Sequence, residues 1–263
     1  QFDTRGLGMV LRAAARRGAA KCLLGIGGSA TNDGGFGMAR ALGWRFLDAR
    51  GHPIERWTHL PSLARIEAPS EREWPRRVTV AVDVQNPLLG LQGCTRVYGP
   101  QKGLRAPDFA EAEAALSRLA RVARVQFGKD FAAHAGAGAA GGLGFGLAAF
   151  AGARLTPGFE LVAHEAKLEA VLRRADLVVT GEGRLDRSTL MGKAAGALAA
   201  RCRKLGVPCV ALGGDAAEAN QLAGLFLKVG VITALTSSPQ AHKRAGHWLA
   251  ELAFRVSRDF DQA

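Results

Sequence analysis

The alternation of short apolar runs with helix-like stretches is the feature that most constrains the fold of this chain. Residues 77–84, RVTVAVDV, alternate in polarity and are rich in valine, which is typical of a strand. Residues 107–128 carry an apolar stripe at helical spacing, opened by Pro107 and closed by Gly128. Because strands that alternate with helices favour parallel pairing, the pattern predicts the α/β class. We expect further strands at 21–26, 44–48, 176–183, 207–214 and 229–235, and further helices at 8–19, 37–43, 164–175, 191–206 and 239–258.

The composition is that of a folded chain without a membrane or disulfide signature. Hydrophobic residues make up 48% and charged residues 22% of the 263 residues, which predicts a packed core. No apolar run approaches the roughly 20 residues that span a bilayer, and the first residues lack the apolar segment of a secretory signal. The cysteines form no C-x-x-C pair, and Cys22 and Cys209 lie in apolar runs, which indicates a reducing compartment. We therefore expect a cytoplasmic protein with no membrane partner.

The net charge of +12 raises the alternative of a nucleic-acid partner. Arg118, Arg121 and Arg124 share one face of a predicted helix, opposite its apolar stripe, which is typical of a solvated face. Aromatic residues make up only 6% of the chain, so few side chains are available to stack on bases. We expect no nucleic-acid partner, and local use of some cations at a phosphate site.

Three glycine-rich segments lie next to predicted strands, at 25–37, 135–146 and 181–192. In open α/β sheets, ligands bind beyond the carboxyl ends of the strands. Glycine at such places lets the backbone approach an anion and leaves N–H groups free to bind it. The three segments therefore predict a phosphate-handling site.

Polar side chains recur in the same places. Carboxylates there can take a proton from a hydroxyl group or hold Mg²⁺, and lysines can neutralise phosphate charge. Helix capping and turn chemistry explain any one of these residues, but their recurrence with so much glycine favours a binding site. The residues are Asn32, Asp33, Asp83, Asn86, Gln101, Lys102, Glu182, Arg184, Asp186, Ser188, Thr189 and Lys193.

Generic motifs are weaker guides in this sequence. GIGGSA at 25–30 and GAGAAG at 136–141 both fit a dinucleotide fingerprint, but neither opens directly into the helix of a clean βαβ unit. The Walker pattern is absent, because Ala194 follows Lys193 and no glycine stands five positions before Gly192. The histidines show no metal-binding spacing.

Four long motifs, in this order, resemble glycerate kinases of the bacterial type-1 family. They are GIGGSATNDGGFGMARALG at 25–43, AVDVQNPLLGLQGCTRVYGPQKG at 81–103, AGAGAAGGLGFGL at 135–147 and DLVVTGEGRLDRSTLMGK at 176–193. The resemblance covers nearly the whole chain. It implies ATP-dependent phosphorylation of D-glycerate, usually at the 2-hydroxyl group, with Mg²⁺ as cofactor.

The resemblance also implies two α/β domains, one of them flavodoxin-like and the other inserted within it. Residues 1–165 would form the inserted domain, and residues 166–263 the C-terminal part of the flavodoxin-like domain. The family's upstream DSFKGS-like and DGGEGT-like segments do not occur in this sequence. Ser188 and Ala195 stand where the family usually has Gln and Pro. The sequence does not fix the oligomeric state, and a homodimer is compatible with it.

On this resemblance, the polar residues receive candidate roles. Asp83 is the first choice for the group that orients or deprotonates the glycerate hydroxyl, and Asp186 is the second. Lys102 and Lys193 would offset negative charge, and Arg184 would grip the glycerate carboxylate. Asp33 or Glu182 would serve Mg²⁺. The predicted substrate- and nucleotide-binding residues are Gly27, Gly28, Ser29, Thr31, Asn32, Asn86, Gln101, Gly138, Gly141, Gly181 and Arg184.

Three alternatives to a working kinase remain open at the level of sequence. The first is a ligand-binding fragment of a glycerate kinase that does not catalyse the reaction. The second is a nucleic-acid-binding protein that uses its positive charge. The third is a nicotinamide-dependent oxidoreductase that uses residues 25–30.

Overall fold

The computed structural model describes residues 2–190, 194–217 and 222–258, without the side chain of Ser188. The chain divides into two compact units, unit 1 up to Gly158 and unit 2 from Phe159 onwards. Each unit has its own parallel sheet, which confirms the predicted α/β class. The division falls at the N-terminus of α6 (Gly158–Glu165), whereas the expected boundary at 165/166 falls at its C-terminus.

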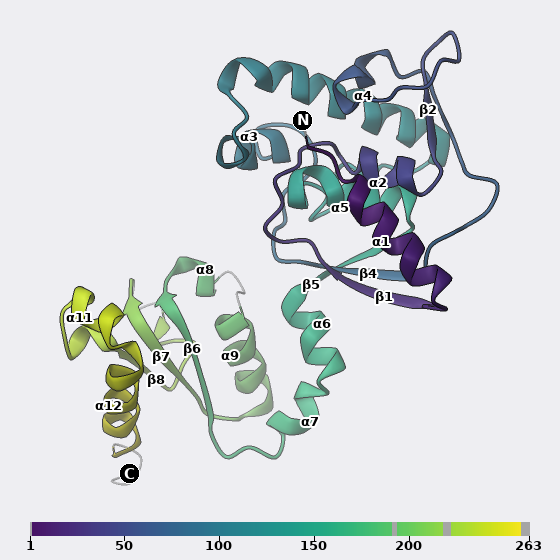
Figure 1. Ribbon diagram of the computed structural model, residues 1–263. Helices are drawn as coiled ribbons and strands as arrows, with labels where there is room; N and C mark the ends of the chain where they lie inside the picture. The colour runs from purple at the N-terminus through teal and green to yellow at the C-terminus, as the bar shows by residue number, and fades with distance from the viewer. Residues whose placement is uncertain (1, 191–193, 218–221, 259–263) are drawn as a thin grey trace. The chain divides into compact units, whose positions relative to one another are not determined.

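Unit 1 is built on a three-stranded parallel sheet in the order β1-β4-β5. Helices α1, α2 and α5 lie together on one side of this sheet (Figure 1). Glycine at position 8 lets α1 and α2 pack closely, because a Cβ atom there would lie 2.5 Å from the carbonyl oxygen of Met38. The elements are α1 (Arg5–Arg16), β1 (Lys21–Gly25), α2 (Phe36–Ala41), β2 (Arg45–Leu47), η1 (Trp57–Ser62), β3 (Arg65–Glu67), β4 (Arg77–Val82), α3 (Cys94–Tyr98), η2 (Pro100–Lys102), η3 (Ala106–Asp108), α4 (Phe109–Phe127), α5 (Ala139–Phe150) and β5 (Arg154–Pro157).

The largest core of unit 1 lies under α4. The apolar stripe of that helix is buried as predicted, at Ala112, Leu116, Leu119 and Ala123. Four phenylalanines, all at most 1% exposed, complete this core with tilted or edge-on ring contacts. They are Phe36, Phe46, Phe145 and Phe150.

Unit 2 contains a second three-stranded parallel sheet, in the order β6-β7-β8. One cluster of buried side chains includes Ala199 and Cys202 of α9, and a separate cluster includes Leu252 and Val256 of α12. The elements are α6, α7 (Leu168–Leu172), β6 (Val178–Leu185), α8 (Arg187–Leu190), α9 (Ala194–Leu205), β7 (Cys209–Ala216), β8 (Lys228–Val231), η4 (Ile232–Ala234), α11 (Ser238–Lys243) and α12 (Ala245–Arg258).

The structure corrects three predictions in unit 2. The helix expected over 164–175 is broken at Lys167, whose φ of 50° is left-handed. The helix expected over 239–258 is two helices, α11 and α12. The strand expected to end at a glycine turn instead continues to Leu185, because the glycines of β6 and β7 let the two backbones run side by side.

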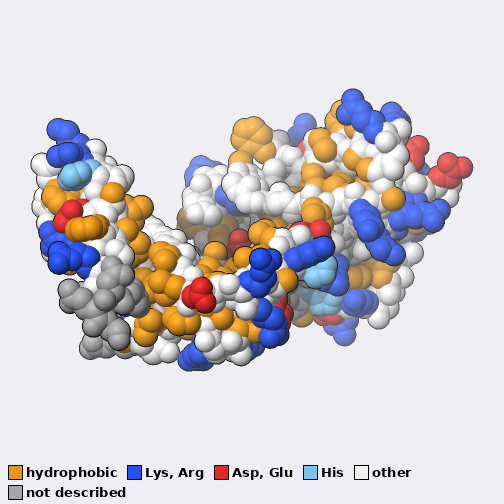
Figure 2. All heavy atoms as spheres, turned by 90° about the horizontal axis from the view of Figure 1, so that it is seen from below, with side chains coloured by type: hydrophobic (Ala, Val, Ile, Leu, Met, Phe, Trp, Pro, Cys, Tyr) orange, Lys and Arg blue, Asp and Glu red, His pale blue; other side chains and the backbone are white. Residues whose placement is uncertain are grey.

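Two surface properties bear on whether the chain has a membrane or a nucleic-acid partner. Within the described residues, no helix combines the length and hydropathy that crossing a bilayer requires. On the face shown in Figure 2, the lysine and arginine side chains lie in separate groups with apolar and acidic side chains between them.

Candidate functional site

The first glycine-rich loop, which follows β1, is organised around the buried carboxylate of Asp33. This side chain is fully buried and accepts hydrogen bonds from the backbone N–H groups of Thr4 (2.9 Å), Gly35 (3.1 Å) and Gly37 (2.9 Å). It also accepts one from the Thr4 hydroxyl group at 2.8 Å. Burial raises the pKa of Asp33, against the effect of these hydrogen bonds. Asp33 therefore joins the loop to the start of α1, and its predicted role as a Mg²⁺ ligand stays a prediction.

Lys102 connects the second motif to this loop. Its Nζ donates hydrogen bonds to Ser29 Oγ at 2.8 Å and to the carbonyl oxygen of Thr31 at 2.7 Å. Burial lowers the pKa of Lys102, while the nearby Cys94 and Asp33 act to raise it. The structure therefore brings together segments 25–37 and 81–103.

Asp83 follows β4 at the carboxyl end of the unit 1 sheet. Its side chain is exposed, and its Oδ1 accepts a hydrogen bond of 3.0 Å from the backbone N–H of Gly158. A Cβ atom at position 158 would lie 2.7 Å from this Oδ1, so a side chain there would displace the carboxylate. Asp83 is thus held in place by the backbone that follows β5.

A cavity of about 270 Å³ lies at the carboxyl ends of β1 and β4. Ser29, Asp83 and Lys102 all line it, so a hydroxyl group, a carboxylate and an ammonium group share one small space. Such a set can bind an acid and accept a proton from a hydroxyl group. The remaining lining residues are Ile26, Gly27, Gly28, Ala81, Val82, Val84, Tyr98, Gln101, Ala139 and Ala140.

Two predicted binding residues near the cavity, Asn86 and Asn32, have internal partners. Asn86 Oδ1 accepts a hydrogen bond from the Tyr98 hydroxyl at 2.6 Å, and its Nδ2 donates to the carbonyl oxygen of Gln92 at 2.9 Å. Asn32 Nδ2 donates to Thr95 Oγ1 at 3.2 Å. Within the described part of the chain, Asn32 Oδ1 and Thr31 Oγ1 are buried without a hydrogen-bond partner. The sequence analysis did not select Tyr98, although it is the only tyrosine of the chain.

Gly138 and Gly141, two of the predicted binding residues, make close packing contacts. A Cβ atom at 138 would lie 2.3 Å from the carbonyl oxygen of Pro87, and one at 141 would lie 1.9 Å from that of Thr31. Both glycines are buried, and neither lines the cavity. The 135–146 segment therefore packs closely against the other two loops through these glycines, while its Ala139 and Ala140 line the cavity.

The fourth motif lies in unit 2, along β6. Gly181, Glu182 and Arg184 are residues of the strand and not of a turn, which corrects the prediction that this motif begins where the strand stops. Gly181 is needed for strand pairing, since a Cβ atom there would lie 2.4 Å from the carbonyl oxygen of Leu212. The predicted residue Lys193 lies outside the described residues.

Thr189 organises the polar end of β6. It is fully buried, accepts a hydrogen bond from the backbone N–H of Asp186 at 3.1 Å and donates one to Glu182 Oε1. Glu182 is therefore held by the turn that follows its own strand. The predicted residues fall into two groups, one in each unit.

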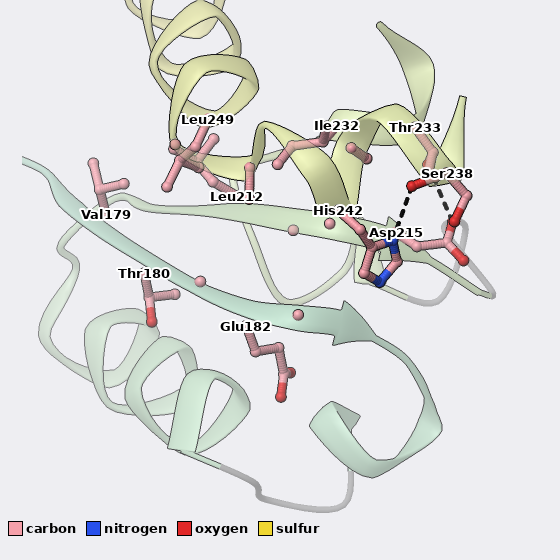
Figure 3. A pocket seen from close by; sticks show the side chains of 17 residues that line it. Val179, Thr180, Glu182, Leu212, Asp215, Ile232, Thr233, Ser238, His242 and Leu249 are labelled. Carbon is pink, nitrogen blue, oxygen red and sulfur yellow. Dashed lines mark hydrogen bonds between the residues drawn. The ribbon is translucent and has the colours of Figure 1, made fainter. Parts of the chain in front are cut away.

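Unit 2 has its own cavity, of about 640 Å³, which Figure 3 shows from close by. Apolar side chains line much of it, and Asp215, Thr233, Ser238 and His242 gather at one end. Thr233 Oγ1 donates a hydrogen bond of 3.2 Å to Asp215 Oδ1. The sequence analysis missed these four residues. The position of Asp215 near the end of β7 was an available signal, because the same reasoning had selected Asp83.

No group of three or more His, Cys, Asp or Glu side chains suited to a metal ion occurs among the residues that the structure describes. Mg²⁺ at nucleotide sites is commonly held by one or two carboxylates together with substrate phosphates. Of the two predicted ligands, only Glu182 lines a cavity.

Comparison with known proteins places these features in a family context. The model of the glycerate kinase family matches residues 1–261. A glycerate kinase of Halalkalibacterium halodurans is 38% identical over 97% of this chain and 69% of its own length. A glycerate kinase of Bacillus subtilis is 42% identical over 81% of this chain and 56% of its own length.

A glycerate 2-kinase of Escherichia coli is 39% identical, again over 81% of this chain and 56% of its own length. The crystal structure of a protein assigned as glycerate kinase 2 from Salmonella typhimurium LT2 superposes with a TM-score of 0.72 at 39% identity. That match covers 86% of this chain and 60% of the other chain. The chain thus spans 56% to 69% of the length of the relatives described here.

Proposed function

Since this chain belongs to the glycerate kinase family, we propose that it takes part in the ATP-dependent phosphorylation of a hydroxyl group of D-glycerate. The single observation that carries this proposal is that Asp83 and Lys102 line one small cavity at the carboxyl end of the unit 1 sheet. Phosphoryl transfer depends mainly on positioning and on neutralising charge, and this cavity offers an ammonium group and a carboxylate that can position a hydroxy acid.

In the proposed reaction, Asp83 accepts the proton of the glycerate hydroxyl group. The hydroxyl oxygen forms a bond to the γ-phosphorus of ATP, and the bond from that phosphorus to the bridging oxygen breaks, which leaves ADP. The 2-hydroxyl is the proposed acceptor, as the resemblance implies and as the name of the Escherichia coli relative suggests. Asp186 is the second choice for the base.

The roles of the unit 2 residues are part of the same proposal. Glu182 is the proposed protein ligand of Mg²⁺, together with phosphate oxygens of the nucleotide. Mg²⁺ would neutralise charge on the phosphates. Arg184 and Gly181 remain proposed substrate- or nucleotide-binding residues, as does Lys193 outside the described residues.

The proposal also covers the compartment, the partners and the oligomeric state of the protein. We propose a cytoplasmic protein that acts on small molecules, without a nucleic-acid or membrane partner, and a homodimer as its candidate assembly. Light scattering after size-exclusion chromatography tests the assembly.

The experiment that tests the function is ³¹P nuclear magnetic resonance of the chain with ATP, Mg²⁺ and D-glycerate. The proposal expects a phosphoglycerate signal to grow as the γ-phosphorus signal of ATP declines. The second candidate, a binding fragment without catalysis, is favoured by the 56% to 69% of its relatives' length that the chain spans. It predicts saturable binding of glycerate or ATP with no phosphoglycerate.

A further inference from the structure

The ammonium group of Lys102 donates to neutral oxygen atoms, and among the described residues the carboxylate of Asp33 acts on it without forming an ion pair. Its side chain is half-buried, and within the described residues no ion pair is recorded for it. The recorded bonds, to Ser29 and Thr31, use two of its three N–H donors. Removing an ammonium group from water without a counter-charge is costly, so this position favours an anion that arrives as a ligand.

The volume of the cavity limits the size of that ligand. At about 270 Å³ it is smaller than the roughly 300–1,000 Å³ pockets that enclose drug-sized molecules. A three-carbon acid suits this space, whereas a whole nucleotide does not. The unit 2 cavity is larger, at about 640 Å³.

The charges that line the cavity limit the kind of anion. Lys102 is its single described cation, and Asp83 is its single described carboxylate. A phosphate with two negative charges would meet one cation and be repelled by Asp83. A carboxylate carries one charge, which Lys102 matches, and a hydroxyl group on the same molecule can donate a hydrogen bond to Asp83.

We infer that the unit 1 cavity is the hydroxy-acid subsite and that Lys102, not Arg184, holds the carboxylate of the acid. The inference rests on the proposed function and deepens it by assigning one cavity to one substrate. Lys102 binds the carboxylate, Ser29 and Thr31 fix the direction of the ammonium group, and Asp83 faces the hydroxyl group. The subsite selects hydroxy acids against neutral polyols, because a polyol leaves the ammonium group unpaired.

Calorimetric titration of the chain with D-glycerate, in the absence of nucleotide, tests this inference. We expect D-glycerate and 3-hydroxypropionate to bind and glycerol, which lacks the carboxylate, not to bind. Inorganic phosphate and ADP are not expected to displace D-glycerate from this cavity. The inference is overturned if glycerol binds as tightly as D-glycerate. It is also overturned if phosphate displaces D-glycerate at a concentration below that at which D-glycerate itself binds.

The variant Lys102→Met keeps an unbranched side chain, one heavy atom shorter, and removes its charge. We expect it to weaken D-glycerate binding roughly ten- to hundredfold, the usual effect of losing a hydrogen bond to a charged group. Lys102→Arg should restore part of this loss. The matched control is Lys21→Met, an exposed lysine at the other end of β1, which should bind as the parent chain does. If Lys102→Met binds D-glycerate as the parent chain does, or if only Arg184→Gln loses affinity for D-glycerate, Lys102 does not hold the carboxylate.

A direct spectroscopic measurement covers the case in which Lys102→Met does not fold. With labelled lysine side chains in the unmodified chain, D-glycerate should shift the Nζ signal of Lys102 and glycerol should not. An Nζ signal that stays in place at saturating D-glycerate overturns the inference. The two proposals can fail separately. If only the proposed function is wrong, D-glycerate still binds at Lys102 but gives no phosphoglycerate with ATP.

Discussion

The Nζ of Lys102 lies 2.8 Å from the hydroxyl oxygen of Ser29, a residue 73 positions earlier in the chain. This contact joins the loop after β1 to the segment that follows β4, and the cavity lies where the two meet. The geometry of the candidate site therefore depends on long-range contacts that can be tested one at a time.

The affinity for D-glycerate should depend on pH through Lys102. Burial lowers the pKa of this side chain below its ordinary value of 10.5, and only the charged form can pair with a carboxylate. As the pH rises through the lowered pKa, the ammonium group loses its proton, so the affinity falls at a lower pH than for an exposed lysine. Calorimetry between pH 7 and pH 10 measures this effect. Lys102→Arg should show no fall over this range, and a flat profile for the unmodified chain would contradict the account.

Gly141→Ala should strongly destabilise unit 1. The residue has a φ of 70°, and a Cβ atom would lie 1.9 Å from the carbonyl oxygen of Thr31. We expect the free energy of unfolding to fall by about 3 kcal/mol or more, measured by urea denaturation. The matched control is Gly128→Ala, where φ is 64° and no heavy atom lies within 4 Å of the added Cβ. The control should lose only about 1 kcal/mol, and equal losses in both variants would refute the packing argument.

Asp33→Asn should separate structural from metal-binding roles. Asp33 accepts four hydrogen bonds through its two carboxylate oxygens. The substitution replaces one of these oxygens with an NH₂ group, which cannot accept a hydrogen bond, so the bonds to that oxygen are lost. We expect a loss of about 2–4 kcal/mol in the free energy of unfolding. The exposed Asp130→Asn, which keeps an acceptor for the N–H of Ala132, is the control and should change stability by at most about 0.5 kcal/mol. A stable Asp33→Asn protein with impaired Mg²⁺ dependence would support the metal-binding role.

Thr189→Val tests the polar turn of unit 2. Valine keeps the shape of the side chain and removes both the acceptor for the N–H of Asp186 and the donor to Glu182. Because Thr189 is fully buried, we expect a loss of about 1–3 kcal/mol. Thr180→Val, in β6 and with no side-chain hydrogen bond among the described residues, should differ from the parent by at most about 0.5 kcal/mol. Thermal or urea unfolding measures the stability of both variants. An unchanged free energy of unfolding in Thr189→Val would contradict a stabilising role for the hydrogen bonds of Thr189 to Asp186 and Glu182.

Local patterns predicted much of the fold but little of the pairing between distant segments. The strand at 77–84 and the helix at 107–128 are visible in the sequence because each carries its own periodicity and end signals. The position of Asp83 at a strand end follows from the same reasoning. Whether Asp33 binds a metal or the chain itself depends on Thr4, which approaches it only in the folded protein.

Glycine was the most ambiguous signal. At Gly138 and Gly141 it permits contact between loops, and in β6 it permits strand pairing, whereas the sequence favoured anion binding for all three segments. Composition alone does not distinguish loop contact, strand pairing and anion binding, because each of them requires a residue that has no side chain. Asp215 was missed although it directly follows the expected strand at 207–214; in the structure that strand, β7, continues to Ala216.

The turnover number of Asp83→Asn, relative to that of the unmodified chain, tests the central claim most directly. The assay follows phosphoglycerate formation at saturating ATP and D-glycerate. If Asp83 accepts the hydroxyl proton in the unit 1 cavity, turnover should fall about a hundredfold or more while D-glycerate still binds. Near-normal turnover in Asp83→Asn would contradict the account.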